Sequence, residues 1–522
     1  MRISKMMRGM LVLSTAGLLL AGGMEIAQAQ PCETDEFALC MASDWARWHH
    51  LGRSVSISGD TAVAGGHPDD SDYGAPGWAY VYERNHGGLG NWGEVAKLTP
   101  SDGADGDKFG WSVSISGDTI VVGAYEHDNP FGSCGAAYVF ERDAGGPDNW
   151  GQVAKLRTSD AEGNDNLGYA VAIDGDVIVA GARNENVEGA AYVFVKPPDG
   201  WTNMFQTAKF KAANPIRNEK FGAAVAISGD TIVIGDYNTP GYEGIGAAYI
   251  FAEPPDGWVD ATETAKLTAS DGAGSDVFGL SVAIDGEVVV VGAPQDDDAG
   301  SDSGSAYIFK RPPDGWVDMT ESVKLTAYGG VADERFGESV AIDGDTALIA
   351  LRQHSSAGIG AGCVFIYDGS NWIEQGRLLP SDGEPYDGYA RSVSISGDQA
   401  VIGTPDWDYH PGGVPGRLVG AMYVFDYLSD CNDNGVLDAC DIDDGVLHDA
   451  DNDGIPDECG CPGDIDGDGD TDHSDLGELL AAWCTQEGDP NWNPNADLDG
   501  DGHVGHGDLG ILLADWGCAV SP

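Results

Sequence analysis

The chain has 522 residues and a formal net charge of −60, because 86 acidic residues outnumber 26 basic ones. This length is enough for a large core and for more than one domain. A surface this acidic repels nucleic acid and anionic lipid, so the composition excludes nucleic acid as an expected partner.

Residues 1–29 have the pattern of a secretory signal peptide. Three basic residues lie within the first eight, an apolar run spans 10–21, and the small residues Ala27 and Ala29 suit cleavage before Gln30. No later apolar stretch is long enough to span a bilayer. Ten cysteines fit an oxidising compartment. We therefore expect a secreted protein, extracellular or at the cell surface, with no membrane span.

One phrase, Gly-x-Ser/Ala-Val-x-Ile-Ser/Asp-Gly-Asp/Glu, recurs seven times after this segment. The copies begin 53 to 58 residues apart, at Gly52, Gly110, Gly168, Gly222, Gly279, Gly337 and Ala390. A fixed period of this size indicates a repeat architecture.

Each repeat contains four strand signals, which are clear in the second copy. Ser112–Ser116 alternates small polar and β-branched residues, and 119–123, 136–142 and 153–156 are the later apolar runs. Small residues on the first strand suit the crowded centre of a propeller. The first two strands are joined by Ser-Gly or Asp-Gly, and Asp-Gly favours a type I′ hairpin turn, as at Asp174-Gly175.

The last repeat ends at its third strand, Ala421–Phe425. The segment Phe37–Asp44, before the first phrase, occupies the place that 95–102 holds in the next repeat. We therefore predict a mainly β protein, a seven-bladed β-propeller over 35–429, in which an N-terminal strand closes the last blade and removes an open sheet edge.

Phe-Gly pairs open several repeats, and one copy continues with Gly-Ala-Pro at 292–294. The phenylalanines are Phe109, Phe221, Phe278 and Phe336. This pattern resembles the FG-GAP repeat of the integrin α-subunit propeller and of many secreted bacterial proteins. The resemblance implies a propeller used for adhesion or ligand binding. Family propellers often hold calcium in blade loops, but Asp296–Asp302 does not keep that spacing, so we expect no such site there.

An acidic pair recurs before the Phe-Gly position. The pairs are Asp102/Asp107, Asp160/Asp165, Asp271/Asp276 and Asp382/Asp387. Two interpretations are open: aspartates that bond the backbone of their own turn, or weak cation binding.

The composition changes after Ser429, since 430–522 contains 25 acidic residues and no Lys or Arg. Two loops in 461–520 have acidic residues at spacings that suit calcium, which prefers oxygen ligands around a turn with Gly at position 6 and a carbonyl at position 7. The expected ligands are Asp464, Asp466, Asp468, Asp470, Asp472 and Asp475 in the first loop, and Asp497, Asp499, Asp501, His503 and Asp508 in the second. A short apolar helix is expected after each loop, at 475–483 and 508–516. This duplicated pattern resembles a type I dockerin, which implies a cohesin-like protein partner.

Two further acidic loops lie in 430–460 and resemble thrombospondin type 3 repeats. The resemblance implies Ca²⁺ ligands at Asp430, Asn432, Asn434, Asp438 and Asp441, and at Asp449, Asp451, Asp453 and Asp457. Six cysteines are interleaved with the acidic loops of the tail, at 431, 440, 459, 461, 484 and 518. We expect disulfides among them, with 15 possible pairings, and zinc binding is the rival interpretation.

No familiar catalytic motif is present: the sequence has no Gly-x-Ser-x-Gly, no HExxH and no P-loop. His49, His50 and His127 are expected at the surface. A tryptophan recurs near the fourth strand, either as packing or as a platform for sugars, at Trp92, Trp150, Trp201, Trp258, Trp316 and Trp372. We expect a non-catalytic propeller that binds an extracellular protein or polysaccharide through its loops. The alternative is a polysaccharide lyase or glycosidase.

Overall fold

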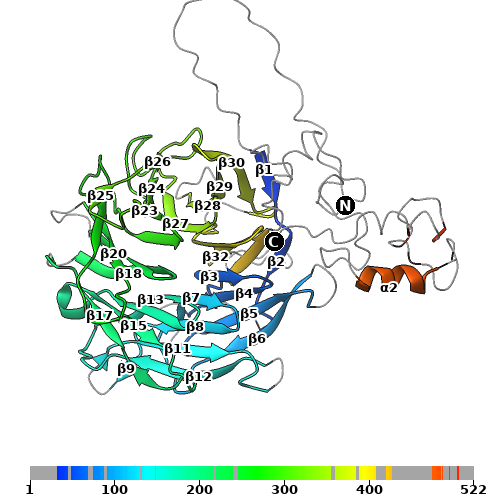
Figure 1. Ribbon diagram of the computed structural model, residues 1–522, viewed down its shortest axis with the longest axis horizontal. Helices are drawn as coiled ribbons and strands as arrows, with labels where there is room; N and C mark the ends of the chain where they lie inside the picture. The colour runs from blue at the N-terminus through cyan, green and yellow to red at the C-terminus, as the bar shows by residue number, and fades with distance from the viewer. Residues whose placement is uncertain are drawn as a thin grey trace, which may run out of the picture. The chain divides into compact units, whose positions relative to one another are not determined.

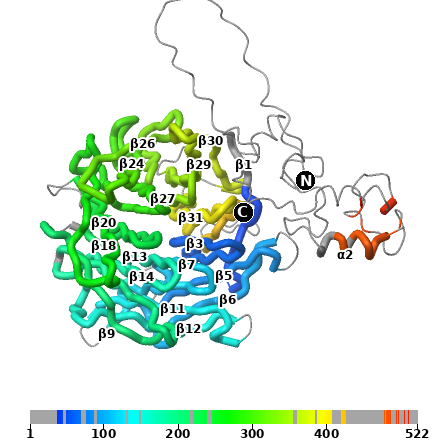
Figure 2. The backbone as a smooth tube through the Cα atoms, in the orientation of Figure 1, coloured from blue at the N-terminus to red at the C-terminus, as the bar shows by residue number. Residues whose placement is uncertain are grey.

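The computed structural model describes residues 32–44, 49–68, 75–86, 91–129, 132–146, 149–215, 219–238, 245–353, 359–383, 387–406, 419–425, 473–483, 485, 493, 496, 503–504 and 509. These residues are coloured in Figure 1, and most of them are coloured in the tube view of Figure 2. The chain divides into two units, 1–30 and 31–522, and the second contains every described residue.

Seven sheets, each with four antiparallel strands at its core, surround a common axis (Figure 1). In each blade the first of the repeat's four strands lies next to the axis, and the fourth lies farthest from it. The first three blades are β3(Ser54–Ser58), β4(Thr61–Gly66), β5(Trp78–Arg84) and β6(Trp92–Leu98); β7(Phe109–Ser116), β8(Thr119–Ala124), β11(Ala136–Glu141) and β12(Gly151–Arg157); and β13(Leu167–Asp174), β14(Val177–Ala182), β15(Ala190–Val195) and β17(Ala208–Phe210).

The next three blades repeat this order. They are β18(Glu219–Ser228), β19(Thr231–Asn238), β20(Ala247–Ala252) and β21(Ala265–Thr268); β22(Ser281–Asp285), β23(Val288–Ala293), β24(Ser305–Lys310) and β26(Val323–Leu325); and β27(Phe336–Asp343), β28(Thr346–Leu351), β29(Ala361–Tyr367) and β30(Trp372–Leu379). The seventh contains β31(Ser392–Ser396), β32(Gln399–Thr404) and β33(Ala421–Phe425). The innermost strands contact both neighbours, and β31 contacts β3, so the ring is closed.

The outermost strand of the seventh blade comes from the start of the described chain. Strand β2(Ala38–Cys40) pairs antiparallel with β33, with Leu39 opposite Tyr423. The seven-bladed propeller and its closure by an N-terminal strand are therefore confirmed.

Three blades gain a fifth strand that the sequence did not predict. The segment just before an outermost strand pairs in parallel with the outermost strand of the preceding blade. These segments are β1(Cys32–Asp35) on β30, β16(Met204–Phe205) on β12 and β25(Met319–Thr320) on β21. Each therefore covers a sheet edge that would otherwise be open.

The hairpin turn at the inner end of each blade differs from the predicted type I′ turn. Asp174 pairs with Val177, so the two turn residues are Gly175 and Asp176 rather than Asp174 and Gly175. Gly175 has φ +52°, and Asp176 is not among the residues with positive φ. A type I′ turn needs positive φ at both positions, so this prediction is wrong; glycine alone at the first position is typical of type II′.

A ring of hydrogen bonds joins the seven hairpin turns. The Ser or Asp before each turn accepts a hydrogen bond from the turn glycine N–H of the next blade, at 2.7 to 3.2 Å. The acceptors are Ser58, Ser116, Asp174, Ser228, Asp285, Asp343 and Ser396. The repeated Ser/Asp-Gly of the phrase is therefore a connection between blades.

The hydrophobic core lies between neighbouring blades. Phe109 is completely buried, in a cluster that includes Val81 of the first blade and Ile120 of the second. Gly110 has φ +86°, and a Cβ there would lie 2.0 Å from the carbonyl oxygen of Trp78. The Phe-Gly pair thus fills the space between two blades and lets their backbones approach closely.

Smaller elements complete the described structure. They are a hairpin of β9(Asp128–Asn129) and β10(Gly132–Ser133), a 3₁₀ helix η1(Glu185–Val187) and an α-helix α2(His473–Ala481). In the tail, Leu479 and Ala482 pack with Ala496 and Val504. Most of the predicted second helix lies outside the described residues.

Candidate functional site

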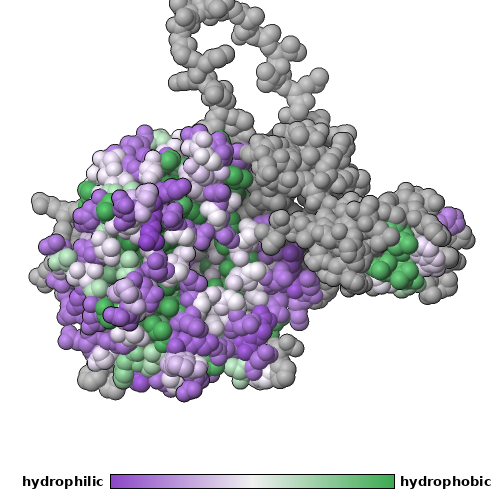
Figure 3. Space-filling model, viewed as in Figure 1, coloured by the Kyte–Doolittle hydropathy of each residue, from purple (hydrophilic) through white to green (hydrophobic). Residues whose placement is uncertain are grey.

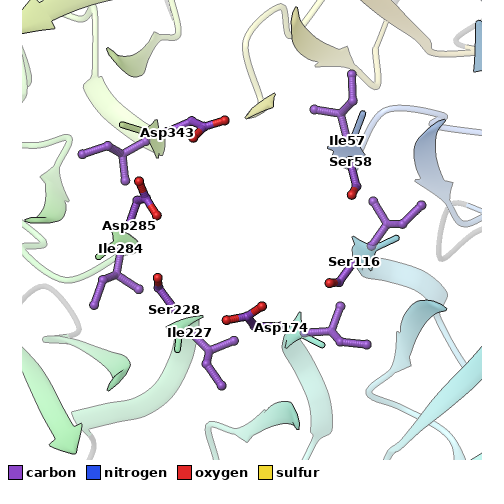
Figure 4. A pocket seen from close by; sticks show the side chains of 12 residues that line it. Ile57, Ser58, Ser116, Asp174, Ile227, Ser228, Ile284, Asp285 and Asp343 are labelled. Atoms are coloured by element: carbon purple, nitrogen blue, oxygen red, sulfur yellow. The ribbon is translucent and has the colours of Figure 1, made fainter. Parts of the chain in front are cut away.

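The hairpin turns surround one end of the central channel. A cavity of about 210 Å³ lies there. It is lined by Ile57, Ser58, Ile115, Ser116, Ile173, Asp174, Ile227, Ser228, Ile284, Asp285, Ile342 and Asp343 (Figure 4). Its carboxylates and hydroxyls belong to the hydrogen-bonded ring, so we assign this end to the scaffold.

The opposite end is formed by the variable second position of the phrase. This position begins the inner strand, whereas the hairpin turn ends it. Its occupants are Arg53, Trp111, Tyr169, Ala223, Leu280, Glu338 and Arg391. The residues at the far end of each second strand join them, at His67, Tyr125, Arg183, Tyr237, Pro294, Arg352 and Pro405. We call the Arg, Glu, Trp and Tyr members the arginine–aromatic cluster: Arg53, Trp111, Tyr125, Tyr169, Arg183, Tyr237, Glu338, Arg352 and Arg391.

Aromatic rings hold two of the guanidinium groups. The Arg53 guanidinium lies 4.0 Å from the centre of the Trp111 ring, and that of Arg183 lies 3.6 Å from the centre of the Tyr169 ring. The Trp111 and Tyr169 rings are 5.5 Å apart, and Tyr125 contacts both. These distances are typical of cation–π contacts and of aromatic pairs.

Carboxylates hold the other two guanidinium groups. The buried Glu338 accepts a hydrogen bond from Arg391, and its Oε1 lies 3.3 Å from Nη1 of Arg352. Asp406 lies 3.8 Å from Nη2 of Arg352 and 3.3 Å from Nδ1 of His50. Burial acts to raise the pKa of Asp406, but the His50 hydrogen bond and the two arginines lower it overall.

The cluster contains four arginines and one glutamate, so its formal charge is positive. Burial, followed by the repulsion of Arg391, lowers the pKa of Arg53 to about 9. Burial and the nearby Arg183 also lower the pKa of Lys220. The pKa of Tyr237 is raised by burial and by Tyr169, whereas Arg183, which donates a hydrogen bond to the Tyr237 hydroxyl at 3.3 Å, acts to lower it. Side chains of the third and fourth blades therefore meet at this end of the channel.

The first aspartate of the recurring acidic pair belongs to a different network. Asp102 accepts hydrogen bonds from the Tyr138 hydroxyl at 2.9 Å and from Lys155 Nζ at 2.6 Å. The same tyrosine and lysine contacts recur at Asp44, Asp160 and Asp271. Burial acts to raise the pKa of Asp102, and these two hydrogen bonds lower it overall. The network ties blades together.

The second aspartate of the pair bonds the backbone of its own turn. Oδ2 accepts a hydrogen bond from the N–H three residues earlier at Asp107, Asp165 and Asp276. The turn interpretation is confirmed at these three positions.

One group of carboxylates has the spacing of a metal site. Asp271, Asp296 and Asp298 each offer an oxygen within 4.8 Å of the others. The ammonium group of Lys324 lies 2.5 to 3.1 Å from all three. A lysine therefore already supplies the positive charge there.

Two of the histidines predicted at the surface are buried. His127 lies 2.8 Å from Asp107 and 2.7 Å from Lys155, because its loop packs into the network between blades. His49 is buried against the Trp78 ring, and burial lowers its pKa to about 4.

The recurring tryptophans are packing residues. Five of them are at most 9% exposed: Trp92, Trp150, Trp201, Trp258 and Trp316. Trp372 packs, partly buried, against a cluster in the sixth blade. The first five are too buried to serve as platforms for sugars.

Nearly all of the predicted calcium ligands lie outside the described residues. Asp475 lies in α2, and His503 is exposed beside Val504, whose N–H bonds the Thr485 carbonyl at 3.0 Å. The calcium sites therefore stay predictions, as do the dockerin-like module and the signal peptide.

The six tail cysteines, for which disulfides were predicted, also lie outside the described residues. In the propeller, Cys40 and Cys363 form no disulfide. Both are buried thiols, and burial raises the pKa of each well above its ordinary value. Among the helices that the structure describes, none has the length and apolarity to cross a membrane.

Seven stretches match the FG-GAP repeat family, at 35–82, 92–140, 150–194, 204–251, 261–309, 319–367 and 372–425. A comparison with curated proteins finds no match. Among solved structures, one similar chain is a putative 6-phosphogluconolactonase from Bacteroides uniformis ATCC 8492. It is 14% identical, with a TM-score of 0.41, and the match covers 66% of this chain and 88% of that one.

One feature of the sequence could have predicted the arginine–aromatic cluster, namely the variable second position of the phrase. The other variable position of the phrase holds Ser or Ala in every copy, whereas the second position holds Arg, Trp, Tyr, Ala, Leu or Glu. Because the second position differs in chemistry from copy to copy while the rest of the phrase stays uniform, its side chains are not needed to build the shared blade structure.

Proposed function

The chain belongs to the FG-GAP repeat family, and on that premise we propose that it is a secreted, non-catalytic, calcium-binding protein for adhesion or ligand binding. Its ligand, an extracellular protein or polysaccharide, binds at the channel end that carries the arginine–aromatic cluster. The acidic tail binds Ca²⁺ and attaches the propeller to a cohesin-like partner or to a surface.

The observation that carries the ligand-binding proposal is the arginine–aromatic cluster itself. Most of the described face in Figure 3 is hydrophilic or neutral, and the repeated positions of the phrase build connections between blades. The cluster instead gathers cations and large aromatic rings from several blades at one end of the axis. Binding residues are typically carried on loops and strand ends that a rigid scaffold positions.

Two observations support the calcium-binding and docking role of the tail. The spacing of the carboxylates in the four loops matches what calcium requires of its oxygen ligands. Helix α2 begins at His473 and overlaps the helix predicted after the first dockerin-like loop. A dockerin-like module would use this duplicated loop-and-helix pattern to hold a cohesin-like protein.

A glycan array, combined with a pull-down of extracellular proteins in calcium and again in EDTA, tests the proposal. We expect a ligand to be retained by the propeller and a protein partner to be retained by the tail only with calcium. A reducing-end assay on the retained polysaccharide distinguishes a non-catalytic binding protein from a lyase or glycosidase. Release of new reducing ends would overturn the non-catalytic role, and no retained ligand in either format would overturn the binding role.

A further inference from the structure

We propose that the arginine–aromatic cluster binds the carboxylate groups of an acidic polysaccharide, with Arg53 and Arg183 as the groups that contact them. This inference rests on the proposed function, in which the ligand binds at this end of the propeller. It adds the chemical class of the ligand and the residues that recognise it.

Neither Arg53 nor Arg183 has a carboxylate partner among the residues described, a property that they share with Arg157 and Arg335 outside the cluster. The Arg53 guanidinium makes a ring contact with Trp111, and no ion pair or hydrogen bond of that group is found within the described part. The Arg183 guanidinium donates a hydrogen bond to the Tyr237 hydroxyl at 3.3 Å. Its buried Nε has no hydrogen-bond partner in the described structure.

Most of the other described arginines have carboxylate partners. Arg142 bonds both Glu83 and Asp118, and Arg377 bonds Glu374 at 2.7 Å. With 86 acidic residues against 26 basic ones, two unpaired guanidinium groups at one end of one axis are not explained by a shortage of carboxylates.

A third cation reinforces this arrangement. The Lys220 ammonium bonds the amide oxygen of Asn184 at 2.8 Å rather than a carboxylate. It lies close enough to Arg183 for repulsion to lower the pKa of Lys220, in addition to the effect of burial. Holding unpaired charges partly out of water costs free energy, and an anionic ligand offsets that cost.

The geometry of the two guanidinium groups suits a carboxylate. Trp111 and Tyr169 lie against one face of each group and restrict its orientation. Stacking leaves the N–H donors at the edge of the plane available, and these donors match the two oxygens of a carboxylate. Trp111 and Tyr169 belong to neighbouring blades, so the two donors are fixed relative to one another.

A polymer with repeated carboxylates fits better than a protein surface. A protein interface usually centres on a contiguous apolar patch. None of the exposed large apolar residues of the described propeller belongs to the cluster; they are Phe37, Phe205, Ile245, Val259, Val317, Tyr328, Val331 and Ile359. The three unpaired cations come from the first, third and fourth blades, and successive uronate residues of one chain supply separate carboxylates for them.

The test measures binding of short oligogalacturonates to the full-length protein by calorimetry, in physiological salt with calcium. The fully methyl-esterified oligomer is the matched ligand, because it keeps the sugar and removes the charge. The variants are Arg53→Ala, Arg183→Ala and Arg53→Lys, with Arg311→Ala as a control for the loss of one positive charge outside the cluster. Far-UV dichroism and thermal melting confirm that each variant is folded.

We expect the acidic oligomer to bind and the ester to fail, and each alanine variant to weaken binding about tenfold or more, the scale of a lost charge-assisted hydrogen bond. Arg53→Lys should recover part of the loss and Arg311→Ala should bind normally. Equal binding of acid and ester, or unchanged binding by both alanine variants, would overturn the inference and leave the proposed function intact. Full competition by inorganic phosphate would also overturn it, because the site would then select a small anion. Failure of the oligomers alongside a hit elsewhere on the glycan array would overturn the uronate assignment alone.

Discussion

The amide of Gly59, in the first blade, donates a hydrogen bond at 3.1 Å to Oγ of Ser396, in the seventh. The two residues are 337 positions apart in the chain. An equivalent hydrogen bond joins each of the remaining six pairs of neighbouring blades. Together with the pairing of β2 and β33, it closes the ring. The phrase that marks the repeat in the sequence is therefore also what fastens one repeat to the next.

Replacing Ser396 with Ala should weaken this closure. The Gly59 amide would lose its acceptor at a solvent-exposed position, so we expect a loss of about 1 kcal/mol in the free energy of unfolding. Chemical denaturation of the full-length protein measures it. Ser370→Ala, at an exposed turn outside the ring, is the matched control. Equal stability of the two variants would show that the ring bond contributes nothing.

Deleting residues 31–44 should destabilise the propeller far more than a point substitution. The deletion removes β1 and β2, and it exposes the edges of β30 and β33 for pairing with other chains. We expect a lower melting temperature and self-association, measured by calorimetry and by light scattering. A chain lacking only residues 1–30 is the control. Identical melting of the two shortened chains would contradict the role of β2 in closing the ring.

The fold was predictable where a short pattern determines it locally. The seven phrases, and the lack of a fourth strand pattern in the sequence after Phe425, were enough to predict the ring and its closing strand. The pairing of β1 with β30 was not, because it depends on how neighbouring blades approach. The shift of the turn to Gly175-Asp176 also escaped, since Asp-Gly alone does not fix the register.

The candidate site was less predictable for the same reason. Arg53 and Trp111 occupy equivalent positions in successive repeats, 58 residues apart, and nothing in the sequence says that one stacks on the other. Likewise the contact of Lys155 with Asp102 joins residues 53 positions apart, in successive repeats. These contacts exist only after the blades have closed into a ring.

Asp165 should make stability depend on pH. Burial, with a smaller effect from Glu185 and other nearby carboxylates, raises its pKa from 3.8 to about 6. The folded state therefore holds this proton more tightly than the unfolded state does. The resulting stability is fully present below pH 3.8 and is lost as the pH rises through 6.

In the variant Asp165→Asn the side chain cannot ionise. Its amide oxygen can still accept the hydrogen bond that the Glu162 N–H donates to Asp165 at 2.6 Å. We expect the variant to be more stable than the parent above pH 6, by roughly 1 to 3 kcal/mol, and equally stable near pH 4. Thermal melts across this range, with exposed Asp105→Asn as the control, measure the difference. A difference that does not vary with pH would contradict the shifted pKa.

Removing calcium should unfold the acidic tail. The segment 430–522 contains 25 acidic residues and no Lys or Arg, so its clustered carboxylates repel one another without a cation. We expect EDTA to change the far-UV dichroism of the tail and calcium to restore it, while the melting of the propeller changes little. A tail spectrum unaffected by chelation would refute the calcium loops.

Lys324 should hold three carboxylates together in place of a metal ion. Its ammonium group contacts Asp271, Asp296 and Asp298, and Asp296 is buried. Replacing Lys324 with Ala leaves Asp296 without this cation and leaves all three carboxylates within 4.8 Å of one another. Breaking a partly buried pair of this kind should cost about 2 to 3 kcal/mol in the free energy of unfolding.

Calcium should recover part of that loss, because the three carboxylates then offer the oxygen ligands that it prefers. The measurement is the melting temperature of the propeller transition for Lys324→Ala, in EDTA and in calcium. Lys266→Ala is the matched control, since Lys266 lies at the equivalent place over the Tyr249 ring and forms no ion pair with the described residues. A calcium response of equal size in both variants would assign it to another part of the chain. A response confined to Lys324→Ala would show that one lysine separates an ion-pair network from a cation site in this blade.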